Sequence, residues 1–300
     1  MQFIKSKDEK ILVLTSFSVL LLYIYLNGGM ALHPDSNMYI EIIQSLSSGE
    51  NYYNNYDPSV TLLRPLMYYL ALPFYLLLGD ASHSLTLLNS LFYILSVLFF
   101  YRYVLILFKD QRLAFLSSLY FLSSFPILYW GLSILPEMGS WFFVIFLLYN
   151  LEGFDVSVRS RTNFLIFLAI GLSILYKTNL VVIPLFIFLM LFSNFGFKNF
   201  PYYDFFLFGI FISIPVFLNQ VFVWYYFDIN YYDDFLRESL FFWEKDATAS
   251  NYEGELYSSE YQFKYTQTYR TLTFFIAFPF LFPFFFLGLY RIKEDNFELY

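Results

Sequence analysis

The stretch SLTLLNSLFYILSVLFFYRYVLI, residues 84–106, decides the fold class of this chain. Its only charged residue is Arg102. A helix needs about 20 mostly apolar residues to cross a bilayer, so this stretch predicts a membrane-spanning helix. Similar apolar stretches recur along the chain and predict eight spans in all. The candidates cover 11–30, 84–106, 113–131, 138–151, 163–176, 180–194, 204–226 and 271–290.

The composition agrees with a membrane protein. Of 300 residues, 59% are hydrophobic and 14% are charged, whereas soluble domains carry about a quarter charged residues. We therefore predict an all-α polytopic membrane protein with a single transmembrane domain over 1–300. The net charge of −7 and the absence of a basic patch exclude a nucleic-acid partner. The absence of cysteine excludes disulfide scaffolds, thiolate zinc sites and cysteine nucleophiles.

The distribution of Lys and Arg predicts the orientation, because basic residues collect in short cytoplasmic segments. With the N-terminus and C-terminus inside, most of the basic residues are cytoplasmic and the outer segments are acidic. The cytoplasmic set is Lys5, Lys7, Lys10, Arg102, Lys109, Arg112, Arg159, Arg161, Lys198, Arg291 and Lys293. Two long segments then lie outside, 31–83 and 227–270. Function is expected on this outer face.

The first outer segment contains two predicted juxtamembrane helices. Apolar residues recur at helical spacing from Met38 to Leu46, which predicts an amphipathic helix at the membrane surface, capped by Asp35 or Ser36. The second follows Pro65, a residue favoured in the first turn of a helix. Its apolar run over 65–78 is too short to cross and is interrupted by Pro73, so an interfacial or re-entrant helix is predicted.

A series of short motifs carries a family resemblance. Asp35 follows the first span, and Arg64 and Pro65 lead into an aromatic, leucine-rich run. Further motifs follow in order: RYVLILFKDQR at 102–112, FPILYWG at 125–131, LPE at 135–137 and GLSILYK at 171–177. Over residues 11–195 this order resembles the GT-C membrane glycosyltransferases. The resemblance is greatest to the dolichyl-phosphate-mannose protein mannosyltransferase-like group and its bacterial relatives, which include the lipid A aminoarabinose transferase.

The resemblance implies transfer of a sugar, with inversion, from a polyprenyl-phosphate donor at the outer face. Such transfer needs a base for the acceptor hydroxyl and a positive group for the leaving phosphate. Asp35 is the predicted base, or alternatively a metal-linked carboxylate that orients the acceptor. Lys177 or Arg64 is predicted to hold the phosphate. Glu137 is predicted to orient the sugar or to share a Mg²⁺ or Mn²⁺ ion with Asp35. The family includes metal-using and metal-free members, so both alternatives stay open.

The topology itself places Asp35, Glu137 and Lys177 at one membrane face, each at the border of a different span. We therefore expect these three residues to converge on one site. The tyrosine-rich, acidic segment 227–270 is a candidate lid over the acceptor, in which Arg237 would reach a phosphate. The acceptor itself, whether a glycan, a lipid or a protein, stays open.

Simpler interpretations stand beside these. Asp35 can be only a helix cap, Glu137 only a charge at a helix start, and Lys177 only a side chain that reaches for the interface. Arg64 can stabilise a turn, and 227–270 can be an interfacial aromatic belt. A transporter or flippase of lipid-linked sugars, a non-catalytic GT-C-like protein and a polysaccharide polymerase or ligase are the alternative functions. The composition favours a bacterial inner membrane and a role in the cell envelope.

Overall fold

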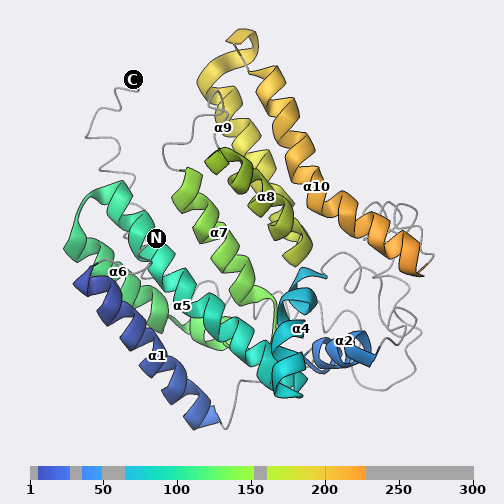
Figure 1. Ribbon diagram of the computed structural model, residues 1–300. Coiled ribbons are helices and arrows are strands. Elements are labelled where there is room, and N and C mark those ends of the chain that lie inside the picture. The colour runs from blue at the N-terminus through green and yellow to red at the C-terminus, as the bar shows by residue number, and fades with distance from the viewer. Residues whose placement is uncertain (1–5, 28–35, 49–64, 152–160, 200, 228–300) are drawn as a thin grey trace, which may run out of the picture. The chain divides into compact units, whose positions relative to one another are not determined.

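The computed structural model describes residues 6–27, 36–48, 65–151, 161–199 and 201–227, and every regular element in these ranges is a helix. The elements, in chain order, are α1 (Lys7–Asn27), α2 (Ser36–Ser48), α4 (Leu66–Leu78), α5 (Ala81–Phe108), α6 (Gln111–Ser123), η2 (Ile127–Gly131), α7 (Glu137–Leu151), α8 (Arg161–Tyr176), η3 (Thr178–Val181), α9 (Val182–Asn199) and α10 (Tyr202–Phe227). Figure 1 shows their arrangement. The all-helical class predicted from the sequence is confirmed for this part of the chain.

Three of the described helices are long and apolar enough to cross a membrane, namely α1, α5 and α10. The apolar helices α4 and α7 are shorter, as is the Asn163–Tyr176 part of α8. Large apolar side chains are exposed on the long helices, including Leu14 and Leu22 on α1 and Phe206 and Phe217 on α10. Exposed apolar surface of this extent is typical of helices that face lipid rather than water. These features support a membrane protein.

Helix α5 is central to the first hydrophobic cluster and packs against α1, α4, α6 and α7 (Figure 1). Glu9, near the start of α1, pairs with Arg102, near the end of α5, so these two helices run antiparallel. Ring contacts progress in step along α5 and α7, from Phe92 with Phe143 to Phe99 with Phe146, so these two helices run parallel. The starts of α5 and α7 therefore lie at the same end of the bundle.

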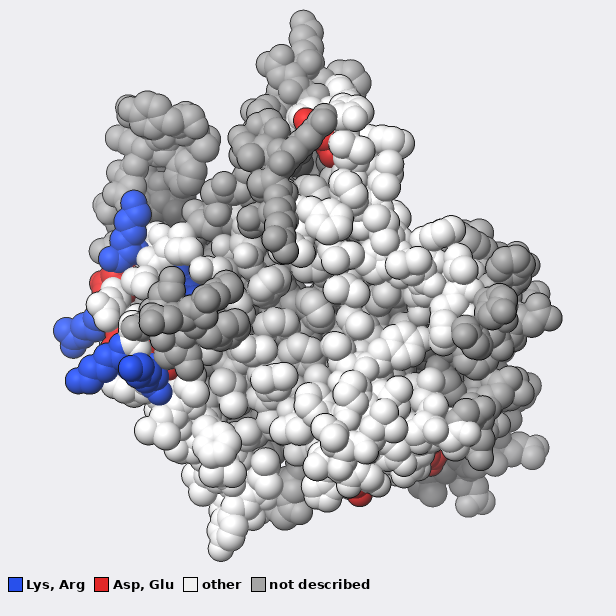
Figure 2. Space-filling view, in the orientation of Figure 1, with Lys and Arg blue, Asp and Glu red and all other residues white. Residues whose placement is uncertain are grey.

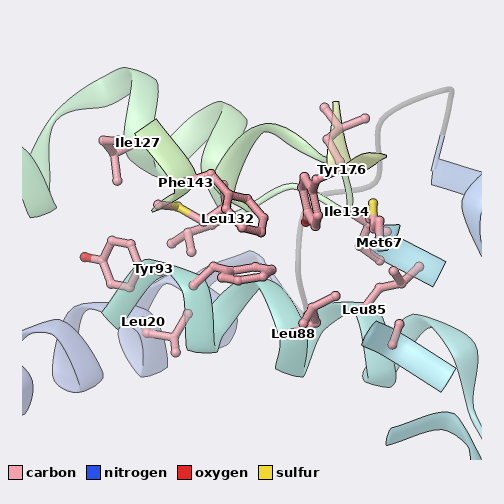
Figure 3. Packing of buried hydrophobic residues seen from close by; sticks show 14 of the residues in the cluster. Leu20, Met67, Leu85, Leu88, Tyr93, Ile127, Leu132, Ile134, Phe143 and Tyr176 are labelled. Atoms are coloured by element: carbon pink, nitrogen blue, oxygen red, sulfur yellow. The ribbon is translucent and has the colours of Figure 1, made fainter. Parts of the chain in front are cut away.

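The core consists of two clusters. The larger one gathers buried side chains from α1, α2, α4, α5, α6, α7 and the end of α8. Figure 3 shows part of it, with Tyr93 and Leu88 of α5 facing Phe143 of α7 and Leu132 before it. The smaller cluster joins α8 to α10, where Ile166 and Ile170 pack with Phe208 and Ile212. Gly171 allows this close approach, because a Cβ there would meet the Ile212 carbonyl and the Pro215 ring.

The predicted span 113–131 is not one continuous helix. Helix α6 ends at Ser123, Ser124 is extended, and a π-helix begins after Pro126. Proline has no N–H and disfavours a helical residue before it, so the helix breaks here. Pro126 cannot donate to the carbonyl of Leu122, and the Tyr93 hydroxyl donates to that carbonyl instead, at 2.8 Å. The break is therefore built into the packing of α5 on α6.

Both helices predicted in the first outer segment are present. Helix α2 begins at Ser36 and ends at Ser48, and α4 begins directly after Pro65. The apolar face of α2 is covered by protein, since Tyr39, Ile42 and Ile43 are buried in the larger cluster. Pro73 does not interrupt α4, which continues to Leu78. That part of the prediction was wrong, because packing on α5 compensates for one lost backbone hydrogen bond.

The two ends of the bundle differ in charge. Exposed Lys7 and Lys10 lie at the start of α1, and exposed Lys109 and Arg112 lie at the turn from α5 to α6. Hydrogen bonding of Gln111 to Asp8 joins these two segments. Figure 2 shows the blue side chains of this face gathered in that region, while most of the remaining described surface is uncharged. The basic end corresponds to the predicted cytoplasmic side.

Candidate active site

The opposite end of the bundle holds an ion pair between two of the predicted site residues. Glu137 begins α7, and Lys177 directly follows α8. The Lys177 Nζ donates to Glu137 Oε1 at 2.8 Å. The side chains are 21% exposed for Lys177 and 26% exposed for Glu137, so the pair borders the surface without being fully solvated. A carboxylate in the first turn is also favoured by the dipole of α7.

Glu137 is fixed by the segment that precedes it. The Asn89 side chain, buried on α5, donates to the carbonyls of Ser133 and Leu135 at 2.8 and 3.1 Å. The Ser36 hydroxyl, at the start of α2, donates to the carbonyl between them, that of Ile134, at 3.1 Å. Three consecutive carbonyls are thus satisfied by side chains of two other helices. This network places the start of α2 beside the segment that leads into Glu137.

Tyr176 lies next to this pair and is fully buried. Its ring packs edge-on against Phe92, with 5.5 Å between centroids, and at the same distance from Phe143. Gly139, in the first turn of α7, provides the space, because a Cβ there would collide with the ring and hydroxyl of Tyr176. The ring is visible in Figure 3, between α7 and the Met67 side chain. Sequence reasoning gave Tyr176 no role, although it belongs to the quoted motif at 171–177.

Glu137 and Tyr176 each have one polar side-chain atom without a hydrogen-bond partner among the described residues. These atoms are the Tyr176 hydroxyl and Glu137 Oε2, and both are buried. Glu137 is also close enough to act electrostatically on Tyr176. A buried polar group without a partner costs about 1–3 kcal/mol. An unpaired acceptor and an unpaired donor in adjacent side chains therefore mark a place where a further polar group would be stabilising.

The convergence predicted for Asp35, Glu137 and Lys177 is seen for the two residues that the structure describes. Asp35 lies outside the described residues; it directly precedes Ser36 in the sequence. Arg64 and Arg237 also lie outside them, as do the segment 228–270 and the eighth predicted span. Asn89 is a polar residue within the predicted span 84–106. Its side chain binds the carbonyls of Ser133 and Leu135, which is a structural use.

The described residues offer no group of three or more metal-ligating side chains. Glu137 presents one engaged oxygen and one free oxygen, with an ammonium group 2.8 Å from the engaged one. An ammonium so close disfavours a second cation on the same carboxylate. Asp35, the other predicted ligand, lies outside the described residues, so a Mg²⁺ or Mn²⁺ ion shared with Glu137 stays a prediction.

Comparison with known proteins adds no further assignment: no family model, no curated protein and no solved structure matches this chain. The order of the motifs and the geometry of the described residues are therefore the features that bear on function. The geometry contributes two features, an inter-helical ion pair and a buried tyrosine hydroxyl beside it.

Proposed function

We propose that the chain is a membrane glycosyltransferase of the GT-C type, with about eight spans and its active site at the extracytoplasmic face. The proposed reaction transfers a sugar from a polyprenyl phosphate to a glycan, lipid or protein acceptor of the bacterial cell envelope. The observation that carries the proposal is the partly buried Glu137–Lys177 pair, located beside the segment that Ser36 binds. Charged groups at the edge of the hydrocarbon region are costly, so their presence favours a functional use.

The proposed chemistry is an inverting displacement. The Asp35 carboxylate removes the proton of the acceptor hydroxyl, and the acceptor oxygen bonds to the anomeric carbon of the sugar. The bond between that carbon and the phosphate oxygen breaks, and its electron pair leaves with the polyprenyl phosphate. A positive group, from Arg64 or Lys177 and with Arg237 as a further candidate, stabilises the charge on the leaving phosphate. An aspartate is ionised at neutral pH and can serve as this base.

The charge distribution supports the proposed topology. The basic residues at the start of α1 and at the turn from α5 to α6 lie at the end opposite Glu137 and Lys177. Basic residues favour the cytoplasmic side, which leaves the ion pair on the outer side. A donor with its sugar outside and its lipid tail in the bilayer would reach such a site from the membrane.

The first test is complementation with a matched pair of variants. The gene is deleted, and envelope glycans, glycolipids and glycoproteins are profiled by mass spectrometry. The wild type, Asp35→Asn and Asp80→Asn are then restored at equal membrane abundance. Asp80 is the control, because it caps α5 by accepting from the His83 N–H at 2.7 Å. Asparagine caps helices about as well as aspartate, so a capping role survives in both variants.

The expected result is that wild type and Asp80→Asn restore a missing sugar, whereas Asp35→Asn lowers transfer about 100-fold or more, as loss of a general base does. The lost mass then identifies the sugar. Equal restoration by all three proteins would show that Asp35 is only a cap and would overturn the site assignment. If deletion leaves every glycan unchanged, transport or a non-catalytic role replaces the enzyme proposal.

A further inference from the structure

We infer that Glu137, Tyr176 and Lys177 form a subsite for a hydroxyl group of the transferred sugar, and that the donor phosphate is held elsewhere. This inference rests on the proposed function and specifies what one part of the site recognises. It adds Tyr176 to the site and gives Lys177 a partner other than phosphate. Arg64 then becomes the principal candidate for the phosphate.

The hydrogen-bonding capacity of Glu137 and Tyr176 favours a hydroxyl ligand. Glu137 Oε2 can only accept, and the Tyr176 hydroxyl can donate, and neither has a partner within the described part of the chain. A single hydroxyl group in reach of both atoms would donate to the carboxylate and accept from the phenol. Native proteins leave few buried polar groups unpaired, so two of them in adjacent side chains indicate a missing group. A sugar offers hydroxyl groups of this kind.

The charge of the Glu137–Lys177 pair favours a neutral ligand. The carboxylate of Glu137 and the ammonium of Lys177 are 2.8 Å apart, so together they present no net charge to a ligand. A phosphate binds best to positive charge that is not already neutralised, and it would be repelled by Glu137. A neutral hydroxyl meets no such repulsion. The pair therefore selects the sugar end of the donor over the phosphate end.

The packing around Tyr176 makes its side chain rigid. The Tyr176 ring is held by Phe92, Phe143 and the Gly139 backbone, so its hydroxyl is fixed in position. The Glu137 and Lys177 side chains are partly exposed, so this cluster borders the surface. The Tyr176 hydroxyl is thus a fixed donor beside two partly exposed charged side chains. This arrangement suits a small polar ligand, because the donor loses no further freedom when the ligand binds.

The test measures lipid binding to the full chain in lipid nanodiscs. The probes are farnesyl phosphate, which lacks a sugar, and its mannosyl and glucosyl esters. The variant is Tyr176→Phe, and the matched control is Tyr93→Phe. Tyr93 is equally buried, but its hydroxyl already donates to the Leu122 carbonyl. The melting temperature of each protein without lipid is measured beside the affinities.

For Tyr176→Phe we expect about tenfold weaker binding of the sugar ester that wild type prefers, the equivalent of one hydrogen bond. Binding of farnesyl phosphate stays unchanged, and the melting temperature is unchanged or higher, because an unpaired hydroxyl has been removed. For Tyr93→Phe we expect a lower melting temperature and unchanged affinities. This opposite pattern separates a ligand-binding hydroxyl from a structural one.

Three results would overturn the inference. Equal weakening of the ester and of farnesyl phosphate would assign the subsite to phosphate. A lower melting temperature with unchanged affinities would show that a buried water satisfies Tyr176. The third result is wild type that binds farnesyl phosphate and its sugar esters with equal affinity. It would show that no sugar subsite exists, whereas the proposed binding of a lipid phosphate would survive. Wild type that binds none of the three lipids would instead remove the proposed function.

Discussion

The two ends of the bundle each carry an ion pair between helices, and the two pairs differ in how completely their atoms are used. Arg102 Nε donates to Glu9 Oε1 at 2.8 Å, and the Ser6 N–H donates to Glu9 Oε2 at 3.0 Å. The Glu9 N–H in turn donates to the Ser6 hydroxyl, which completes a capping box. Both carboxylate oxygens are thus engaged, and the Glu9 side chain is only 6% exposed.

The Glu137–Lys177 pair has the same 2.8 Å contact, but one of its carboxylate oxygens has no partner in the described part of the chain. A pair whose hydrogen bonds are all made serves to hold helices together. A pair that leaves an acceptor and a neighbouring hydroxyl unsatisfied gives up stability that a ligand can restore. The comparison therefore separates an end whose ion-pair atoms are all engaged from the end where we propose that a ligand binds.

The largest difference is expected when the basic partner is removed from each pair. Arg102→Met leaves the Glu9 charge almost fully buried, and we expect a loss of about 3 kcal/mol in the free energy of unfolding. Lys177→Met leaves the partly solvated Glu137, and we expect a loss of about 1 kcal/mol. Unfolding in mixed micelles with increasing SDS measures both. Arg102→Lys is the control, because it keeps the charge at the structural end.

Transfer activity should reverse this order. Lys177→Met lowers activity per folded molecule although the protein stays folded, whereas Arg102→Met lowers the amount of folded protein without changing the activity of what remains. Equal stability losses for the two variants would show that the two pairs are energetically alike. The distinction between the two ends would then have to be abandoned.

The next effect concerns the backbone that supports Tyr176. Gly139→Ala places a methyl group against the Tyr176 ring, and we expect a loss of about 2 kcal/mol from overpacking. Gly209→Ala on α10 is the matched control, since a Cβ there meets nothing within 4 Å. Alanine is the better helix former by about 1 kcal/mol, so the control should be neutral or stabilising. If both variants behave alike, the contact of Tyr176 with α7 is not tight.

A smaller effect on stability, with a clear effect on function, is expected from exchanging the charges. Glu137→Lys combined with Lys177→Glu keeps an ion pair, so stability should return to within about 0.5 kcal/mol of wild type. The carboxylate would then extend from the end of α8 instead of the start of α7, away from its position beside Tyr176. Sugar-ester binding should stay weak. Recovery of binding together with stability would show that only the ion pair matters.

The sequence predicted much of the described fold because its signals are local. The apolar periodicity from Met38 to Leu46 places α2, and Pro65 marks the start of α4. The Lys and Arg distribution anticipated one basic end of the bundle. The break at Ser124 was missed, although Pro126 is a local signal for it, because the apolar run was given more weight than the proline.

Which side chains from different helices pair with one another was harder to predict from the sequence. The expectation that Glu137 and Lys177 converge came from topology, which assigns residues to a face but not to a partner. Tyr176 carries no signal of its own, since an apolar span that ends in tyrosine is common. The burial of its ring follows from contacts with Phe92 on α5 and Gly139 on α7, and no spacing in one sequence shows that these residues meet.

The smallest effect concerns Asp80, a carboxylate that caps the start of α5, at the same end of the bundle as Glu137. The backbone N–H of His83 donates to Asp80, and this bond holds the pKa of Asp80 below its ordinary value of 3.8. A lowered pKa in the folded state adds stability above the unfolded pKa, and that stability is lost as the pH falls through the folded value. The side chain is 52% exposed, so screening by solvent limits the contribution to a few tenths of a kcal/mol.

The measurement is the melting temperature of wild type and Asp80→Asn between pH 7 and pH 3. Asparagine caps α5 without titrating, so the difference between the two proteins should be small at pH 7 and should shift in favour of the variant below pH 4. Transfer activity should not distinguish them at any pH. A loss of activity in Asp80→Asn would mean that a helix cap also takes part in the chemistry. Hydrogen bonding of a carboxylate within the protein would then no longer separate a structural role from a functional one.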